Sequence, residues 1–352
     1  MVRVGLPIAS LLALLVLGSC GGGGDLRVTD DQATRPTPDP TDTASPLPGS
    51  EPPYPVGLTD QDIDVDGVGR RYRVYVPEGV SRPQGVVLVL HGGGGRGAAV
   101  ADDPTSPLSV FRTVADREGF VVVYPAGLPA NDRGERIGWV DCRADNRVSS
   151  DADDLGFLAA LVGKLEDDYD LDRGQIFMAG TSNGALMTQA FAFTHPELVG
   201  AVATSLGNLP ADPLPGDCTT GPSTPVPILL VHGTDDTQMP FDGGCVVDLG
   251  GGCNRGQVTS AKATVQRWLD VNGLSDASPE RRTVDVDPDD GGTADLFVYE
   301  GPTPVHWWRL DGAGHTSPSL TASVQPNRLV GRQNRDVEFA ELVWAFFAER
   351  VQ

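Results

Sequence analysis

Short apolar segments alternate along most of the chain with longer segments in which apolar residues recur at helical spacing. The apolar runs predict strands at residues 86–90, 120–124, 175–179, 201–204, 228–232, 296–300 and 305–310. Helical spacing is clearest over residues 153–169, 183–194, 260–271 and 337–350. This alternation is typical of a mostly parallel central sheet flanked by helices, so the predicted fold class is α/β.

An earlier pair of alternating segments, at residues 62–66 and 72–76, is separated by a glycine-containing turn. This pattern predicts an antiparallel hairpin at the edge of the sheet. Neither an internal repeat nor a change of composition divides the rest of the chain, and we therefore expect a single domain over residues 58–352.

The N-terminal region shows no pattern that could form a core. An apolar run after Arg3, too short to span a membrane, predicts a signal peptide over residues 1–19. The sequence Leu17-Gly18-Ser19-Cys20 resembles a bacterial lipoprotein box, in which the cysteine sulfur is lipid-modified; an ordinary signal peptide with a chance cysteine is the alternative. Residues 20–57, rich in glycine and proline, predict an extended tether. We expect an extracytoplasmic protein, lipid-anchored to the cell membrane or secreted.

The charge of the chain makes one class of partner improbable. Its 352 residues include 26 Lys and Arg against 48 Asp and Glu, which gives a formal net charge of −22 at pH 7. A nucleic acid would meet net repulsion, and no basic stripe stands out to overcome it. We expect no nucleic acid partner, and contact with a membrane only through the lipid anchor.

Four cysteines remain beyond Cys20, and an even number in an exported protein favours two disulfides. Proximity in the sequence favours Cys245 with Cys253, which leaves Cys142 with Cys218. A zinc site is the alternative, but the sequence contains no C-x-x-C pair. We therefore expect no metal.

A candidate nucleophile lies between a predicted strand and a predicted helix, in the sequence Gly180-Thr181-Ser182-Asn183-Gly184. This sequence matches G-x-S-x-G, in which the serine lies on a sharp turn. Side chains two residues before and two residues after the serine would collide there, so both positions need glycine. The helix that follows points its positive end at the turn, and the backbone N–H of Asn183 could stabilise a developing oxyanion. A structural turn is the alternative interpretation.

The candidate base is chosen from five histidines by chain order, which in this class of sheet runs serine, acid, histidine. Three histidines precede any acid placed after the strand at residues 228–232: His91, His195 and His232. His306 falls inside a predicted strand, whereas His315 follows that strand in a glycine-containing loop that could bring it over Ser182. We therefore favour His315 as the base.

The candidate acid should follow the strand at residues 228–232, where it would accept the second imidazole N–H of the base. Asp235 and Asp236 both occupy this turn, and the sequence pattern alone leaves them nearly equal.

A glycine run at residues 92–97 satisfies G-x-G-x-x-G, the pattern of a dinucleotide site. However, the next strand ends in Tyr124-Pro125 without the carboxylate that would hold a ribose, and no Gly-Lys-Ser/Thr follows as a Walker loop requires. The run fits better as an oxyanion loop of the H-G-G-G type, in which the backbone N–H of Gly93 faces the substrate carbonyl.

With these motifs in place, residues 60–350 resemble the polyhydroxybutyrate depolymerase and feruloyl esterase branch of the α/β-hydrolases. The resemblance rests on G-T-S-N-G and on the segments at residues 90–93 (LHGG), 150–157 (SDADDLGF), 232–240 and 312–318 (GAGHTSP). The family's H-G-x-x-D pattern puts the acid at Asp236. The chain departs from the family at Ala185, where a second glycine is usual, and at Ser317, where tryptophan is common.

Several other residues invite a functional interpretation. Trp139 and Trp307 are candidates for binding a sugar or an aromatic group of the substrate; Trp308 would face the opposite side of its strand. Asp153 and Asp154 could be mistaken for a catalytic carboxylate pair, but we expect them to cap the following helix and orient neighbouring loops.

The sequence thus leads to the hypothesis of a surface-anchored serine carboxylesterase that acts on a small or oligomeric ester and requires no cofactor. Ser182 would attack the ester carbonyl, His315 would transfer the proton and Asp236 would orient His315. A serine peptidase on the same fold and a non-catalytic surface-binding lipoprotein are the alternatives, and fold analogy alone cannot choose the substrate.

Overall fold

The structure is a computed structural model that describes residues 52–94, 97–129, 137–144, 151–211, 224–247, 252–286, 288–289, 291–324 and 330–351. The predicted signal peptide, Cys20 and most of the predicted tether lie outside the described residues, as does Cys218. Residues Gly49–Gln352 form one compact unit. No helix within the described ranges is long and apolar enough to cross a membrane.

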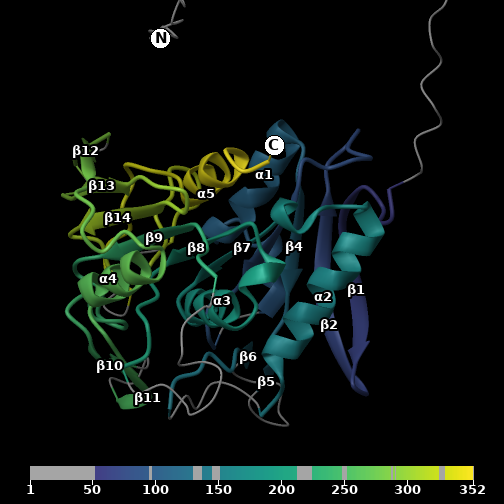
Figure 1. Ribbon diagram of the computed structural model, residues 1–352, viewed down its shortest axis with the longest axis horizontal. Coiled ribbons are helices and arrows are strands. Elements are labelled where there is room, and N and C mark those ends of the chain that lie inside the picture. Colours follow the sequence, from purple (N-terminus) through teal and green to yellow (C-terminus); the bar gives the residue numbers. More distant parts are fainter. Residues whose placement is uncertain are drawn as a thin grey trace, which may run out of the picture. The chain divides into compact units, whose positions relative to one another are not determined.

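A ten-stranded sheet runs through this unit in the order β1-β2-β4-β3-β7-β8-β9-β14-β13-β12 (Figure 1). Its strands are β1 (Gly57–Val65), β2 (Val68–Val76), β3 (Val86–Leu90), β4 (Val121–Pro125), β7 (Ile176–Thr181), β8 (Ala201–Ser205), β9 (Ile228–Gly233), β12 (Glu280–Val284), β13 (Thr293–Tyr299) and β14 (Val305–Asp311). The strands from β4 to β14 in this order pair in parallel, and the strands on either side are antiparallel. This is the sheet of an α/β-hydrolase, as predicted.

Helices cover both faces of the sheet (Figure 1). The α-helices are α1 (Val110–Glu118), α2 (Asp154–Tyr169), α3 (Asn183–Thr194), α4 (Ala261–Val271) and α5 (Phe339–Ala348). Successive residues of β3 point to opposite faces: Leu88 packs in the core cluster that includes α2, α3 and α4, and Val87 in the cluster that includes α1 and α5. Burial on both faces explains why the central strands are continuous apolar runs.

The predicted core strands, the edge hairpin and the four predicted helices are confirmed to within a few residues. The helix α1 was not predicted, because its apolar face is short and consists of Phe111, Val114 and Ala115. The strand β12 was not predicted either, nor were the short strands β5 (Leu128–Pro129), β6 (Ile137–Gly138), β10 (Gly244–Val247) and β11 (Cys253–Val258). The short 3-10 helices are η1 (Gly97–Ala101), η2 (Pro107–Ser109), η3 (Arg173–Gln175) and η4 (Pro196–Leu198).

The packed part of the chain begins before the predicted boundary at residue 58. Tyr54 is buried, and its hydroxyl bonds to the carboxylate of Asp168 on α2 and to the hydroxyl of Tyr72 on β2. The predicted tether therefore ends before Tyr54, because this aromatic side chain contributes to the core.

The predicted disulfide between Cys245 and Cys253 is confirmed. It joins β10 to β11, which form a separate two-stranded sheet. Cys142 is also disulfide-bonded. Its predicted partner, Cys218, lies outside the described residues, and that pairing stays a prediction.

Candidate active site

Ser182 occupies a strained turn between β7 and α3. Its backbone angles, φ 54° and ψ −122°, are rare for a residue with a side chain. A Cβ atom at Gly180 would collide with the carbonyl oxygen of Gly184, and one at Gly184 would lie 2.5 Å from the carbonyl oxygen of His91. The turn thus requires glycine on both sides of the serine, which is the steric condition of G-x-S-x-G.

The imidazole of His315 bridges Ser182 and Asp236, although the three residues are far apart in the sequence. Its Nε2 lies 2.8 Å from Ser182 Oγ, and its Nδ1 lies 2.7 Å from Asp236 Oδ2. The other oxygen of Asp236 accepts the backbone N–H groups of Gln238, at 2.9 Å, and Met239, at 2.8 Å. Because both carboxylate oxygens have donors, Asp236 holds the ring of His315 in one orientation.

Asp235, which the sequence pattern could not separate from Asp236, is exposed and accepts a hydrogen bond from the hydroxyl of Thr234 at 3.3 Å. His306, the alternative base, lies on β14 against the ring of Phe346. Burial there lowers the pKa of His306 to about 4. Neither Asp235 nor His306 lines the pocket that contains Ser182.

The other buried histidines have structural positions. His91 accepts the backbone N–H of Gly127 at its Nε2, and Trp307 donates its indole N–H to Nδ1 of His232. Burial lowers the pKa of both imidazoles to about 4, so both are neutral at pH 7.

The glycine loop and the first turn of α3 lie side by side next to Ser182. A Cβ atom at Gly93 would be 3.1 Å from the Cβ atom of Asn183. Asn183 is the first residue of α3, so its backbone N–H has no acceptor within the helix. Gly93 lines the same pocket as Ser182. The two residues predicted to stabilise an oxyanion are thus adjacent to each other and to the serine.

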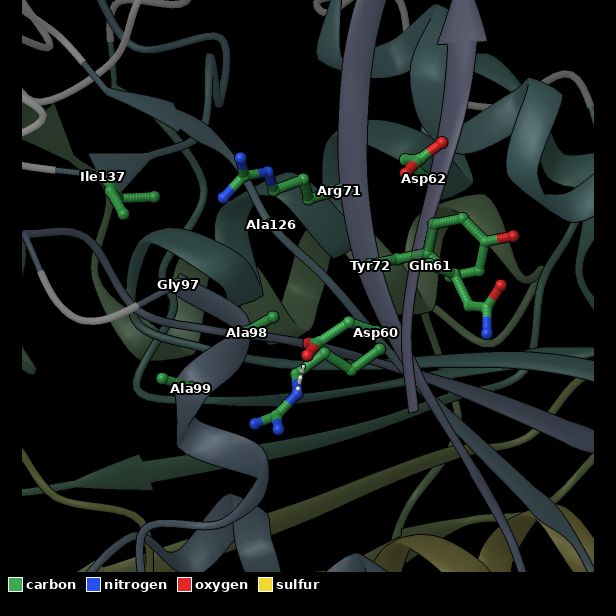
Figure 2. A pocket seen from close by; sticks show the side chains of 11 residues that line it. Asp60, Gln61, Asp62, Arg71, Tyr72, Gly97, Ala98, Ala99, Ala126 and Ile137 are labelled. Atoms are coloured by element: carbon green, nitrogen blue, oxygen red, sulfur yellow. Dashed lines mark ion pairs between the residues drawn. The ribbon is translucent and has the colours of Figure 1, made fainter. Parts of the chain in front are cut away.

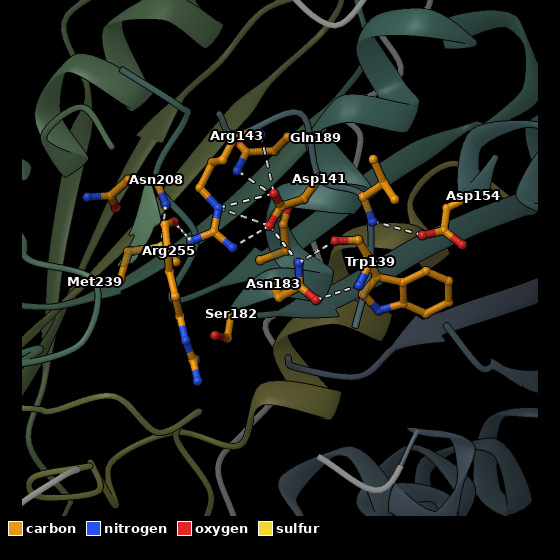
Figure 3. A network of polar contacts seen from close by, with 12 residues as sticks. Trp139, Asp141, Arg143, Asp154, Ser182, Asn183, Gln189, Asn208, Met239 and Arg255 are labelled. Atoms are coloured by element: carbon orange, nitrogen blue, oxygen red, sulfur yellow. Dashed lines mark hydrogen bonds and ion pairs between the residues drawn. The ribbon is translucent and has the colours of Figure 1, made fainter. Parts of the chain in front are cut away.

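The side chain of Asn183 is the centre of a buried polar network (Figure 3). Its Oδ1 accepts the backbone N–H of Trp139 at 2.7 Å, and its Nδ2 donates to the Trp139 carbonyl at 3.0 Å and to Asp141 Oδ2 at 2.6 Å. Asp141 in turn pairs with Arg143, whose Nη2 is 2.6 Å from Asp141 Oδ2. Arg143 donates to the backbone carbonyl of Arg255 at 2.8 Å.

This network could not be predicted from the sequence, because residues from three distant segments form it and no motif connects them. The closest signal in the sequence was that Asp141 and Arg143 flank Cys142, a cysteine already expected in a disulfide.

Ser182 opens into a pocket of about 300 Å³. Its walls combine small, apolar and hydroxyl-bearing side chains with one arginine: Gly92, Gly93, Val100, Ser106, Pro107, Leu108, Thr181, Ser182, Leu206, Gln238, Arg255, His315, Thr316, Ser317 and Val324. A larger pocket of about 520 Å³ lies between η1 and the hairpin of β1 and β2 (Figure 2). The described lining residues of the two pockets do not overlap, and those of the larger pocket include no serine, cysteine or histidine.

The prediction that Trp139 and Trp307 bind substrate is wrong. Trp139 is completely buried and donates its indole N–H to the carbonyl of His91 at 2.9 Å. Trp307 packs against Phe297 and donates to His232. Both indole N–H groups have a hydrogen-bond acceptor inside the core, and neither tryptophan lines the pocket at Ser182.

The expectation for Asp153 and Asp154 is confirmed. Asp153 caps α2 by accepting the backbone N–H of Gly156 at 2.8 Å. Asp154 accepts the backbone N–H of Val140 at 2.8 Å and pairs with Arg70 at 2.5 Å. Both carboxylates therefore position local structure, and neither lines the pocket at Ser182.

A serine hydroxyl, an imidazole and a carboxylate hydrogen-bonded in series form an arrangement suited to acyl transfer. The helix α3 begins directly after Ser182, so its positive end lies at this turn, where it would favour a developing negative charge.

No family model matches the chain. The NocK protein of Nocardia uniformis subsp. tsuyamanensis, which is named an esterase, is 26% identical over 80% of this chain and 80% of its own length. An acetylxylan esterase of Coprinopsis cinerea is 32% identical over 42% of this chain, which spans only 39% of that enzyme's length. The solved acetyl xylan esterase of Aspergillus awamori is 18% identical, with a TM-score of 0.48 over 73% of this chain and 94% of that one. The chain thus has the sheet of an α/β-hydrolase and resembles proteins that are named esterases.

Proposed function

We propose that this protein is an extracytoplasmic serine carboxylesterase that uses Ser182, His315 and Asp236 as its catalytic triad. The observation that carries the proposal is the pair of hydrogen bonds made by His315, at 2.8 Å to Ser182 Oγ and at 2.7 Å to Asp236 Oδ2. These bonds connect a possible nucleophile to a base and the base to an orienting carboxylate.

In this mechanism Ser182 Oγ attacks the ester carbonyl carbon, while Nε2 of His315 takes the hydroxyl proton. The carbonyl oxygen becomes an oxyanion, which the backbone N–H groups of Gly93 and Asn183 stabilise. Asp236 stabilises the imidazolium that forms. His315 then gives its proton to the leaving alcohol, and an acyl group remains on Ser182.

Water then releases this acyl group, and His315 again acts first as a base and then as an acid. His315 takes a proton from water, the resulting hydroxide attacks the acyl carbonyl, and the proton returns to Ser182 Oγ as the acid leaves. The chemistry requires no cofactor.

The relatives support a proposal for the substrate class. An acetylxylan esterase is among the proteins that this chain resembles, and a feruloyl esterase C of Emericella nidulans is 28% identical over half of the chain. The pocket of about 300 Å³ at Ser182 is compatible with a small or planar acyl group. We therefore propose esters of acetic or aromatic acids with a larger alcohol as substrates.

The proposed location rests on the N-terminal sequence and the cysteines. The lipoprotein box at Cys20 would anchor the mature chain, and the disulfide between Cys245 and Cys253 is consistent with an extracellular protein. If the proposal is correct, Cys20→Ser should abolish incorporation of labelled palmitate into the expressed protein. Unchanged incorporation would refute the anchor.

The triad is tested with a short acyl ester and an organophosphonate probe. Ser182→Ala should abolish labelling and lower kcat by several orders of magnitude, and Asp236→Asn should lower kcat by about 10³- to 10⁴-fold with little change in KM. Ser275→Ala, an exposed serine on the surface, is the control. Labelling of a residue other than Ser182 would contradict the proposal, as would faster cleavage of a matched amide than of the ester.

A further inference from the structure

Arg255 brings a positive charge into the pocket at Ser182. The residue lies on β11, and its side chain extends alongside Ser182 (Figure 3). Its Nη2 is 3.9 Å from the position that a Cβ atom would take on Gly94. Arg255 lines the same pocket as Gly93, Ser182 and His315. The guanidinium thus lies next to the loop that we assign to the oxyanion.

The electrostatic character of this pocket differs from that of the whole chain. The chain carries a formal net charge of −22, yet no Asp or Glu is among the lining residues that the structure describes. Arg255 is the one permanently charged side chain among them. Within the described part of this wall, a small anion would meet the positive charge of Arg255 and no carboxylate.

The backbone of Arg255 is held in place from two sides. Its carbonyl accepts a hydrogen bond from Arg143 at 2.8 Å, and Arg143 is itself fixed by Asp141. At the next residue, a Cβ atom on Gly256 would lie 2.5 Å from the carbonyl oxygen of Ala144, so the two backbones are in close contact.

The hairpin that carries Arg255 is also cross-linked, by the disulfide between Cys253 and Cys245. A long side chain on an anchored backbone loses less entropy on binding than one on a free loop. A residue that recognises a ligand needs support of this kind to keep its geometry.

We propose that Arg255 determines the substrate specificity of this site by binding a carboxylate on the ester substrate, close to the ester bond that is cleaved. The guanidinium fork matches the two oxygens of a carboxylate, and none of the other described lining residues carries a permanent positive charge. The inference rests on the proposed esterase function and names a class of ester within it: one whose acyl or alcohol part carries a carboxylate.

Two pairs of esters, matched in shape, test this proposal and separate the two possible positions of the carboxylate. On the acyl side, 4-nitrophenyl hemiglutarate is compared with 4-nitrophenyl valerate. On the alcohol side, 3-acetoxybutyrate is compared with 3-acetoxybutyramide. In at least one pair, the wild-type protein should prefer the charged ester in kcat/KM by about tenfold or more.

Arg255→Gln should remove this preference by lowering kcat/KM for the charged ester about 10- to 100-fold, while kcat/KM for the neutral ester stays within about twofold. Arg255→Lys should retain part of the preference because it retains the charge. Arg71→Gln is the matched control, since it changes the net charge by the same amount at a residue that does not line this pocket. In both pairs, Arg71→Gln should leave the ratio of kcat/KM between the charged and the neutral ester unchanged.

An equal loss of activity on both members of each pair in Arg255→Gln would overturn the proposal, because a structural role predicts that result. Absence of a charge preference in the wild-type protein would overturn it as well. A binding measurement that needs no catalysis separates this proposal from the proposed function: in a Ser182→Ala background, calorimetry should show weaker binding of glutarate when Arg255 is replaced by glutamine. Equal binding would refute the role of Arg255 even if the protein is an esterase.

Discussion

The buried ion pair between Asp141 and Arg143 offers the sharpest test of how the structure supports the site. Only 2% of the Arg143 side chain and none of the Asp141 side chain is exposed. Arg143 Nε lies 3.1 Å from both carboxylate oxygens, and its Nη2 lies 2.6 Å from Oδ2. At these separations, the Coulomb attraction is about 5 to 6 kcal/mol for an effective dielectric constant of about 20.

Removing one partner leaves the other charge buried, which typically costs about 3–5 kcal/mol. We therefore expect Asp141→Leu and Arg143→Met each to lower the free energy of unfolding by about that amount. If the two changes acted independently, their sum would be about 6–10 kcal/mol. The double variant instead removes both charges, so we expect it to cost about 1–3 kcal/mol, the range for leaving the amide of Asn183 without its carboxylate acceptor.

Urea unfolding followed by tryptophan fluorescence measures these free energies, since the chain contains five tryptophans. The exposed pair of Arg117 and Glu341 is a matched control: it is also bidentate, with N–O distances of 2.9 and 2.6 Å, but 53% and 44% of its side chains are exposed. Breaking this pair should cost less than about 1 kcal/mol. A double variant at Asp141 and Arg143 whose cost equals the sum of the singles would refute the reasoning.

Three further changes test other parts of the structure. Replacing Cys245 and Cys253 with serine opens a cross-link of sequence separation 8, and loop entropy predicts a loss of about 2.5 kcal/mol in urea unfolding; an unchanged midpoint would contradict this. Gly184→Ala puts a Cβ atom 2.5 Å from the carbonyl oxygen of His91, so we expect a loss of about 1–3 kcal/mol together with most esterase activity; wild-type values of both would show that the turn tolerates a side chain. Burial lowers the pKa of His91 and of His232 from 6.5 to about 4, so between these values the unfolded chain binds more protons than the folded protein. Stability should therefore fall by about 2 kcal/mol per histidine from pH 7.5 to pH 5, and a flat profile in urea unfolding would contradict this.

The parts of the fold that could be predicted from sequence are those in which burial imposes a simple pattern. Strand β3 was predicted with its observed bounds, Val86–Leu90, because it is buried on both faces and is therefore apolar throughout. Strand β11 was missed because its residues, Cys253–Val258, are polar and only partly buried. It is positioned by a disulfide and by contacts with distant loops, which leave no periodic signal.

The same distinction applies to the candidate site. Ser182 could be found because a steric requirement for two glycines is a local sequence pattern. The choice between Asp235 and Asp236 depends on a one-residue difference within a turn, which periodicity does not resolve. The role of the tryptophans could not be predicted, because aromatic rings occur in both cores and binding sites. Only the burial of Trp139 and Trp307 shows which role they have.

The polar network also predicts how catalysis and specificity are connected. Asp141 bonds to Asn183, whose backbone amide we assign to the oxyanion, and through Arg143 it supports the backbone of Arg255. Asp141→Asn should therefore lower kcat on neutral esters as well as on charged ones, because the oxyanion donor loses a support. Arg255→Gln should affect only the charged esters, because it leaves Asn183 in place. If Asp141→Asn instead lowered activity on charged esters alone, the network would serve Arg255 and not the oxyanion, and our assignment of Asn183 would be refuted.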